Sequence, residues 1–596
     1  MAMHPVDYLV VVLYLLAIVA LGFFLQRKAA RGIESYFLGD RQLPWWALGA
    51  SGMASNTDIA GTMLITALIY ALGTKGFFIG IRGDIVLVMA FFMIFMGKWT
   101  RRAQVMTLAE WMRFRFGSGR EGNLARVISA IANLVLSIGI ISYFAIGGGK
   151  FFGAFLGINE RFAAIFMIVL AMVYTAVSGF YGVIWTDVVQ GVLVFFAIIY
   201  VCVLTLQIVT LPENFSVSLP LEDGSFQEFP TTLADWSNIF PPMELDLPGQ
   251  YGIYNLFGIT IFFYLLKASL GGLSGAGGYM SQRYFAAKSD REAGLLSLFW
   301  IILLSFRWPL VTAFAMLGIH YGMTKEVIAD PELVLPTVIE EYVPMGIKGL
   351  LVACFIAAAM STFDSIINSS AAYWVRDIYQ AYLNPSASSQ QLIRQSRAAS
   401  IVVVMLGLLF SISVGNINEI WSLLVIGFTS GLLIPLLLRW YWWRFNGYGF
   451  AIGTLAGMMA AIITKFSGIS VPQYANFIIP SGCSFLGCML GTFLTAPTDQ
   501  NVLDNFYQIT RPFGFWEPIR KKNPEKIQAK IKAENRRDII ATPIAVSWQL
   551  VLFLMGMMLL MKRWDYLSFL LVLFIWLSIG LYFTWFKHLS KEVIMK

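Results

Sequence analysis

Long apolar runs, separated by short polar segments, follow one another along nearly the whole chain. Most of them reach the length of about 20 residues that a helix needs to cross a bilayer. The pattern predicts about fifteen membrane helices. They are placed at residues 6–25, 45–71, 80–97, 126–155, 160–179, 183–210, 252–280, 293–322, 346–374, 398–415, 418–439, 447–465, 472–495, 541–561 and 565–586.

Composition agrees with this pattern. Hydrophobic residues make up 58% of the 596 residues and charged residues only 13%, whereas a soluble domain has about 25% charged residues. The four cysteines and three histidines show no zinc or disulfide spacing. We therefore expect an all-α integral membrane protein that is not an enzyme, since an embedded enzyme would need a nucleophile with a base or a metal set.

The distribution of basic residues predicts the orientation. If the N-terminus is outside, most of the 42 lysines and arginines fall in segments that face the cytoplasm, as the positive-inside rule requires. The segment 211–250 is then extracellular, and it has seven acidic and no basic residues. We expect a multi-pass protein of the plasma membrane, in bacteria the inner membrane, with a cytoplasmic C-terminus and no nucleic-acid partner.

The segment 498–540 is strongly basic, with nine lysines and arginines between 498 and 538. Two interpretations stay open: an amphipathic segment lying along anionic lipid, or a solvated linker. Membrane lipid is an expected partner in either case, and the sequence implies no obligate protein partner.

Two of the predicted helices are interrupted. Residues 51–58 cut the helix 45–71 with polar side chains, and residues 271–278 cut the helix 252–280 with glycines. Backbone that leaves a helix at membrane depth usually lines a site for a solute or ion, although glycines also allow close helix packing. Because the breaks are five helices apart, they predict two five-helix repeats, the second inverted relative to the first.

Three aspartates lie inside predicted helices: Asp58, Asp187 and Asp364. Each is unfavourable by roughly 2.5–3.5 kcal/mol near the bilayer centre if nothing compensates it. The simplest compensation is a salt bridge to a basic residue of the predicted helices, namely Lys267, Arg307 or Arg82.

A bound cation is the other way to compensate these carboxylates. Ala358, Ser361, Thr362 and Ser365 share one helical face, and Asp364 borders it. Hydroxyl, carboxylate and carbonyl oxygens suit a hard cation such as sodium. The sequence therefore predicts a sodium site and no organic cofactor.

Four segments resemble the sodium/solute symporter family, whose members include sodium/glucose, sodium/proline and sodium/sialic acid cotransporters. They are residues 35–43, 174–190, 282–288 and 443–457. The resemblance covers about residues 6–460. It implies a LeuT-type fold, a five-plus-five inverted repeat with one extra N-terminal and about four extra C-terminal transmembrane helices.

The resemblance divides the chain into seven parts. They are an extra N-terminal helix with the first cytoplasmic loop (1–44), the first inverted repeat (45–210), the acidic extracellular loop (211–250), the second inverted repeat (251–445), two C-terminal helices (446–497), the basic cytoplasmic loop (498–540), and the last two helices with the cytoplasmic tail (541–596).

The family's shared sodium site uses two carbonyls at the first broken helix and a set of small and hydroxyl residues on a later one. The matching positions here are Ala54, Thr57, Ala358, Ser361 and Thr362. A second cation site, present in some members, maps onto Asp187, Asp364 and Ser365. Those members have a hydroxyl residue in place of Asp364, so the site here could hold a second sodium or a shared proton.

The resemblance implies the solute-binding positions less completely than the sodium site. Candidates lie at the two breaks and on neighbouring helices: Asn56, Asp58, Asp84, Gly275, Gly278, Tyr279 and Arg307. A polyhydroxylated solute fits slightly better than a monocarboxylate, which Asp58 and Asp84 would repel.

The expected function is sodium-coupled symport of a small polar organic solute by alternating access, with a sugar or polyol preferred. One alternative is a sodium-coupled carboxylate or amino-acid symporter. Another, from a different class, is a transporter-like membrane sensor. The sensor is disfavoured because the loop 498–540 is too short for a kinase domain.

Overall fold

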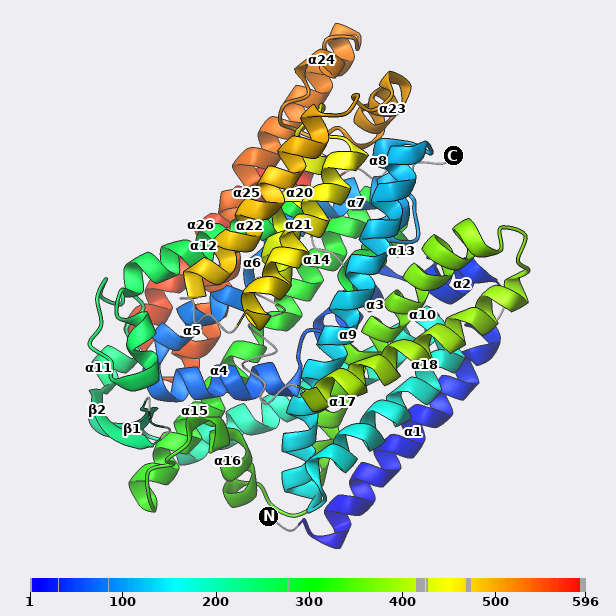
Figure 1. Cartoon of the computed structure of the whole chain (residues 1–596). Helices are drawn as coiled ribbons and strands as arrows, with labels where there is room; N and C mark the ends of the chain where they lie inside the picture. Colours follow the sequence, from blue (N-terminus) through cyan, green and yellow to red (C-terminus); the bar gives the residue numbers. More distant parts are fainter. Residues whose placement is uncertain are drawn as a thin grey trace.

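The computed structural model describes residues 3–29, 32–83, 85–221, 223, 225–275, 278–413, 424, 427–467 and 473–589. Helices dominate this part of the chain and run in several directions, some steep, some sloping and some nearly horizontal in Figure 1. Ten of them are long and apolar enough to cross a membrane, or eleven if the bent pair Thr74–Gly83 and Leu87–Arg102 forms one span. The expected number of fifteen is not confirmed. The run 45–71 is divided into two shorter helices, and residues 418–423, 425 and 426 of the run 418–439 lie outside the described residues.

Helices of the N-terminal part follow the apolar runs closely. They are α1 (Pro5–Ala29), α2 (Ile33–Leu38), α3 (Trp45–Ala54), α4 (Ile59–Leu72), α5 (Thr74–Gly80), α6 (Ile85–Phe91), α7 (Gly97–Arg102), α8 (Leu108–Phe116), α9 (Arg120–Leu156) and α10 (Glu160–Ile208).

Helices of the C-terminal part complete the bundle. They are α11 (Leu233–Trp236), α12 (Phe257–Ser274), α13 (Tyr279–Ala286), α14 (Asp290–Ser305), α15 (Arg307–Thr324), α16 (Val334–Tyr342), α17 (Ile347–Ala372), α18 (Ser389–Ser413), α20 (Thr429–Tyr441), α21 (Gly447–Phe466), α22 (Gln473–Phe493), α23 (Gln500–Thr510), α24 (Glu517–Arg520), α25 (Glu525–Leu560) and α26 (Trp564–Thr584).

Two predicted helix boundaries have a counterpart in the structure. The runs 160–179 and 183–210 are two helices that meet within α10 at a kink, where Gly179 leaves helical geometry with φ of 56°. Glycine adopts positive φ without a steric penalty, so the chain bends there without needing a loop. The run 293–322, predicted as one helix, lies in the single span Asp290–Thr324, in which Phe306 separates α14 from α15.

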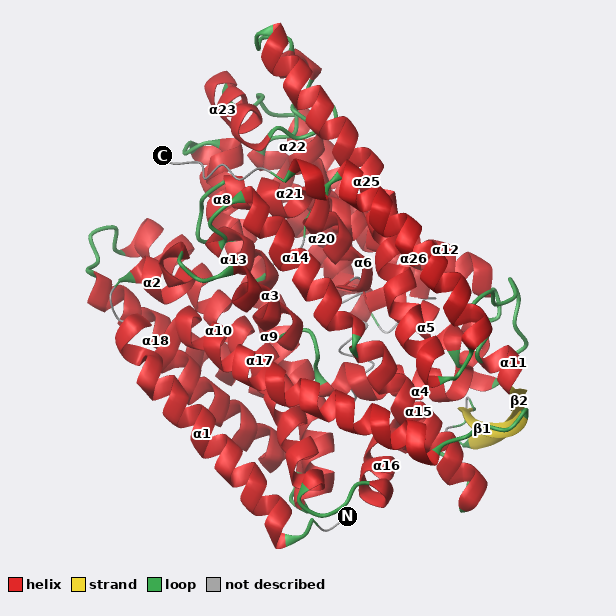
Figure 2. Ribbon diagram, turned by 180° about the vertical axis from the view of Figure 1, so that it is seen from behind, coloured by secondary structure: helices red, strands yellow, loops and turns green. Residues whose placement is uncertain are grey.

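The acidic segment 211–250 is folded onto the end of the bundle. Strands β1 (Asn214–Pro220) and β2 (Phe226–Thr232) pair antiparallel, with Val217 opposite Phe229. The indole nitrogen of Trp236 donates to the carbonyl of Tyr70 on α4 at 3.1 Å. This bond ties the hairpin and α11 to the membrane helices beneath them (Figure 2).

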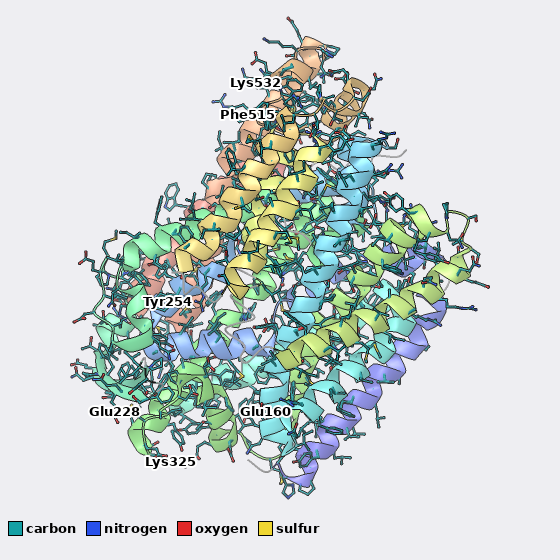
Figure 3. The ribbon with its side chains drawn as sticks, in the orientation of Figure 1. Glu160, Glu228, Tyr254, Lys325, Phe515 and Lys532 are labelled. Carbon is teal, nitrogen blue, oxygen red and sulfur yellow. The ribbon has the colours of Figure 1, made fainter. Side chains whose placement is uncertain are left out.

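Helix α17 lies at the centre of the bundle. In the most hydrophobic stretch of the span Ile347–Leu383, 94% of the residues are buried inside the protein. The corresponding shares are 28% for α1 and 11% for α26. Charged residues gather at the two ends instead, with Glu228 and Lys325 at one end and Lys532 at the other (Figure 3). A membrane helix that faces only protein can carry polar side chains, and α17 provides Ser361, Thr362, Asp364 and Ser365.

Candidate functional site

The first predicted break is present between α3 and α4. Helix α3 ends at Ala54 and α4 begins at Ile59. The Asp58 carboxylate accepts a hydrogen bond from the Gly61 amide at 2.6 Å and so caps α4. Aspartate is a preferred N-cap because its oxygen satisfies an amide that has no partner within the helix. The sequence therefore begins a new helix at Ile59 because Asp58 can cap it.

The second predicted break separates α12 from α13. Gly275 and Gly278 have φ of 76° and 66°, which residues with a side chain rarely adopt. Tyr279 opens α13, and its hydroxyl donates to the Asn56 side-chain oxygen at 2.9 Å. The two breaks, more than two hundred residues apart in the chain, are therefore joined directly.

The hydroxyl face of α17 packs against the first break. The Ser55 hydroxyl lies 3.4 Å from the Ser361 hydroxyl and 2.9 Å from that of Ser365. Thr362 donates to the Ala358 carbonyl at 3.2 Å, and the Ala54 carbonyl accepts the Thr57 amide at 3.2 Å. All five positions expected to hold the first sodium are buried.

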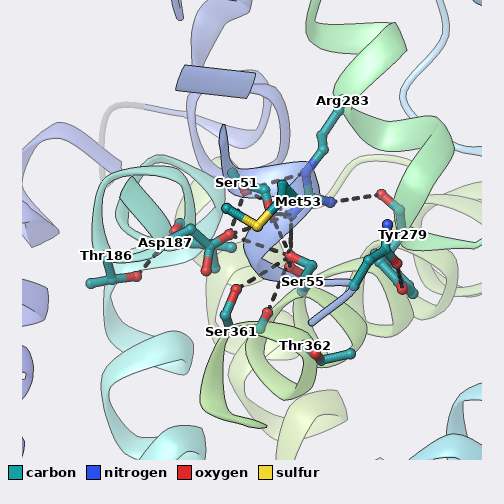
Figure 4. Close-up of polar contacts among 12 residues, drawn as sticks. Ser51, Met53, Ser55, Thr186, Asp187, Tyr279, Arg283, Ser361 and Thr362 are labelled. Atoms are coloured by element: carbon teal, nitrogen blue, oxygen red, sulfur yellow. Dashed lines mark hydrogen bonds and ion pairs between the residues drawn. The ribbon is translucent and has the colours of Figure 1, made fainter. Parts of the chain in front are cut away.

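Asp187 lies beside an arginine that the sequence analysis did not consider as a partner. The guanidinium of Arg283 on α13 is 3.4 Å from the Asp187 carboxylate, and both side chains are fully buried. The same nitrogen donates to the hydroxyls of Ser51, Ser55 and Ser365 at 2.7, 2.7 and 2.9 Å (Figure 4).

Further bonds reinforce this Asp187–Arg283 cluster. Ser51 also donates to the Asp187 carboxylate. Asp364 is fully buried on α17, next to Ser365. The cluster thus joins α3, α10, α13 and α17, with a fixed positive charge beside Asp187.

The sequence offered one signal for Arg283. The residue follows the glycine-rich break closely, within the segment 282–288 that carried part of the resemblance. Among the described residues, the ion pair of Asp187 is made with Arg283 and not with the three basic residues considered beforehand.

A cavity of about 380 Å³ lies at the two breaks. Six of the seven solute candidates line it, and they are Asn56, Asp58, Gly275, Gly278, Tyr279 and Arg307. The seventh, Asp84, lies outside the residues that the structure describes. Further polar residues line the cavity but were not among the solute candidates, and they include Arg82, Asn133, Tyr143 and Lys267. Thr362, expected at the first sodium site, also lines it.

Arg307 is held at the wall of this cavity. One guanidinium nitrogen donates to the Asn56 carbonyl at 3.0 Å, and a Cβ placed on Gly61 would meet both this guanidinium and the Asp58 carboxylate within 3.0 Å. The Tyr143 hydroxyl reaches the same carboxylate at 3.4 Å. Acceptors and donors thus alternate along the wall, an arrangement that can bind a solute with several hydroxyls.

Several known proteins are similar to this chain. The model of the sodium:solute symporter family matches residues 36–459. The chain is 26% identical to a sodium/glucose cotransporter of Vibrio parahaemolyticus over 78% of its own length and 86% of that protein. It is 26% identical to sodium/myo-inositol cotransporter 2 of Sus scrofa over 79% of its length and 71% of that protein.

A solved structure shares the fold. A substrate-bound, outward-open sodium-coupled sialic acid symporter aligns with 83% of this chain and 99% of its own, with a TM-score of 0.65 and 20% sequence identity. The LeuT-type fold expected from the sequence is confirmed.

Proposed function

The chain belongs to the sodium:solute symporter family, and from that membership we propose that it imports a sugar or polyol together with sodium by alternating access. The observation that carries this proposal is the meeting of both broken helices and the α17 hydroxyls at one cavity. A polyhydroxylated solute is favoured because the wall presents both acceptors and donors. A carboxylate or amino acid is the second candidate, because Arg307 would bind an anionic group.

The first sodium site proposed is made of the carbonyls of Ala54 and Thr57 and the side chains of Ser361 and Thr362, with Ala358 beside them. The contact of Ser55 with Ser361 supports it, since it places the first break against α17. We also propose that the N-terminus lies outside a plasma membrane and the C-terminus in the cytoplasm. The basic end with Lys532 and the acidic hairpin with Glu228 support this orientation.

Counterflow in proteoliposomes tests the function. Vesicles preloaded with glucose, myo-inositol or proline are diluted into the same labelled solute, with sodium or choline chloride outside. We expect sodium-dependent accumulation of labelled glucose or myo-inositol, which a channel or a sensor does not give. Accumulation of proline alone would support the amino-acid alternative, and a signal with choline would contradict sodium coupling.

Arg307→Ala should weaken solute binding far more than sodium binding. A hydrogen bond from a charged group contributes about 1.5–3 kcal/mol, so the half-saturation constant for solute should rise roughly 10- to 100-fold. Counterflow at varied solute and at varied sodium separates the two constants. Arg161→Ala, on the exposed first turn of α10, is the control. Equal effects on both constants would make Arg307 a structural residue.

The second cation site proposed comprises Asp187, Asp364 and Ser365. Arg283 already pairs with Asp187 and donates to Ser365, so the proposal requires this guanidinium to move away when the cation binds. At 100 mV each sodium contributes about 2.3 kcal/mol, so two provide roughly 4.6 kcal/mol for accumulation of a neutral solute. We expect reversal potentials of solute flux to give a coupling ratio of about two, falling towards one in Asp364→Ala and in Asp187→Ala. A wild-type ratio of one from pH 5.5 to 8.5, unchanged in Asp364→Ala, would leave both carboxylates as structural residues.

A further inference from the structure

The end of α12 has an unusual set of hydrogen-bond partners. The last carbonyls of a helix have no donor within that helix, and at membrane depth water does not replace it. Here the Ser274 carbonyl accepts from the indole of Trp440 at 3.1 Å and from Arg439 at 3.4 Å. The Leu273 carbonyl accepts from the hydroxyl of Tyr441 at 2.8 Å.

All three donors come from the last turn of α20. The Arg439 and Trp440 side chains are 1% exposed, so both donors are buried inside the protein. Arg439 also brings a positive charge to the C-terminal end of α12, where the helix dipole favours it. The guanidinium stacks 4.4 Å from the ring of Trp111 on α8, which holds it in place.

The end of α20 is held in turn by a segment much later in the chain. Trp516 donates from its indole nitrogen to the Trp440 carbonyl at 2.8 Å. The Phe515 amide donates to the Tyr441 carbonyl at 2.7 Å, and the Phe515 carbonyl accepts from the Trp443 amide at 3.2 Å. Phe515 and Trp442 thus form an isolated parallel bridge at the end of α20.

Two features of the sequence allow and stabilise this contact. Gly514 has φ of 117°, and a Cβ there would lie 2.6 Å from the Tyr441 carbonyl oxygen, so only glycine allows the approach. Phe506 and Trp516 are buried, with 0% and 2% exposure. Arg115 lies over both rings, about 5 Å away, and donates to the Arg439 carbonyl at 2.8 Å.

These contacts bear on the two interpretations of the basic segment 498–540. It was expected either on lipid or in solvent. Phe506, Tyr507 and Trp516 are buried inside the protein instead, whereas Phe515 is 75% exposed. It also lies beyond residues 36–459, which match the family model.

We propose that the segment 506–516 is a brace that fixes the broken helix α12 through the last turn of α20. Trp516, Trp440, Tyr441 and Arg439 are positioning residues. They hold Ser274 and Gly275, which line the cavity, and so set the shape of the solute site. The inference deepens the proposed function, on which it rests for the role of the cavity.

Hydrogen–deuterium exchange of the full chain in nanodiscs tests the brace. Trp516→Phe keeps the ring but removes the donor to the Trp440 carbonyl. We expect about fivefold faster exchange in the last turn of α12 and the first turn of α13, with the exchange of α17 and the thermal midpoint unchanged. A merely structural role would instead lower the midpoint and accelerate exchange throughout.

The matched control is Trp548→Phe, because Trp548 is also buried and donates its indole hydrogen to Ser578 between α25 and α26. It should leave the α12–α13 break unchanged. If a Trp516 variant fails to fold, Trp440→Phe tests the inner layer, since it removes one of the donors to Ser274. Unchanged exchange at the break in the folded variants overturns the brace.

The proposed function is judged separately, by the effect of sodium on the wild-type thermal midpoint. A wild-type protein that sodium does not stabilise would contradict sodium coupling, while faster exchange in Trp516→Phe would still establish the brace. If sodium stabilises the wild type but exchange in Trp516→Phe is unchanged, sodium coupling is supported and the brace is overturned.

Discussion

Replacing Ser361 and Thr362 together by alanine should abolish the stabilisation of the protein by sodium and, with it, sodium-driven uptake. Each of the two hydroxyl oxygens contributes about 1.5–3 kcal/mol to the free energy of sodium binding, by analogy with a hydrogen bond to a charged group. Their loss should weaken sodium binding by at least ~100-fold. The thermal midpoint of unfolding is measured in sodium chloride and in choline chloride at equal ionic strength. The difference between the two measures stabilisation by sodium, and the solute need not be known.

The control removes two hydroxyls from the same helix. Ser369 and Ser370 donate to carbonyls of their own helix at 3.2 and 2.8 Å. Replacing both by alanine should leave the sodium effect close to that of the wild type. A Ser361→Ala, Thr362→Ala protein that sodium stabilises as it does the wild type would show that the proposed first site is wrong.

Arg283→Ala should destabilise the protein by about 3–5 kcal/mol, because it leaves the Asp187 carboxylate buried without its ion-pair partner. It also removes the donor that three serine hydroxyls share. The free energy of unfolding in mixed micelles measures the loss. Adding Asp187→Asn to Arg283→Ala should recover part of it, since the uncompensated charge is then gone.

An exposed ion pair provides the comparison for Arg283. Lys325 and Glu341 lie 2.6 Å apart, but their side chains are 50% and 35% exposed. Lys325→Ala should change the stability by no more than about 1 kcal/mol. An effect of Arg283→Ala as small as this would mean that Asp187 is compensated in another way, and no recovery in the double variant would argue against direct coupling.

The Asp187–Arg283 cluster also bears on the transport cycle. Its members come from α3, α10, α13 and α17, which belong to both of the proposed repeats. We infer that the α3–α4 break and α17 cannot separate on this side of the cavity until Arg283 gives up some of these bonds. A symporter that alternates access needs such contacts to be reversible, and hydroxyl partners make them weaker than a second carboxylate would.

The sequence by itself determined the class of the protein, the two broken helices and the family. These features are local. Hydropathy over twenty residues identifies a span, Asp58 starts a helix wherever it can cap one, and the glycines at 275 and 278 allow backbone angles that end α12. The symporter motifs are likewise contiguous, so no knowledge of packing was needed to find them.

Only the tertiary structure decided which charged residue faces which. Asp187 and Arg283 are 96 residues apart. The place of Arg283 just after the glycine-rich break marks this arginine, but it does not identify Asp187 as its partner. The basic segment 498–540 shows the same limit. Its charges suggested a surface, but Trp516 and Phe506 are buried because α8 and α20 present a matching arginine and carbonyls. Pairings between distant segments depend on how helices pack, and the residue pattern along one helix does not contain that information.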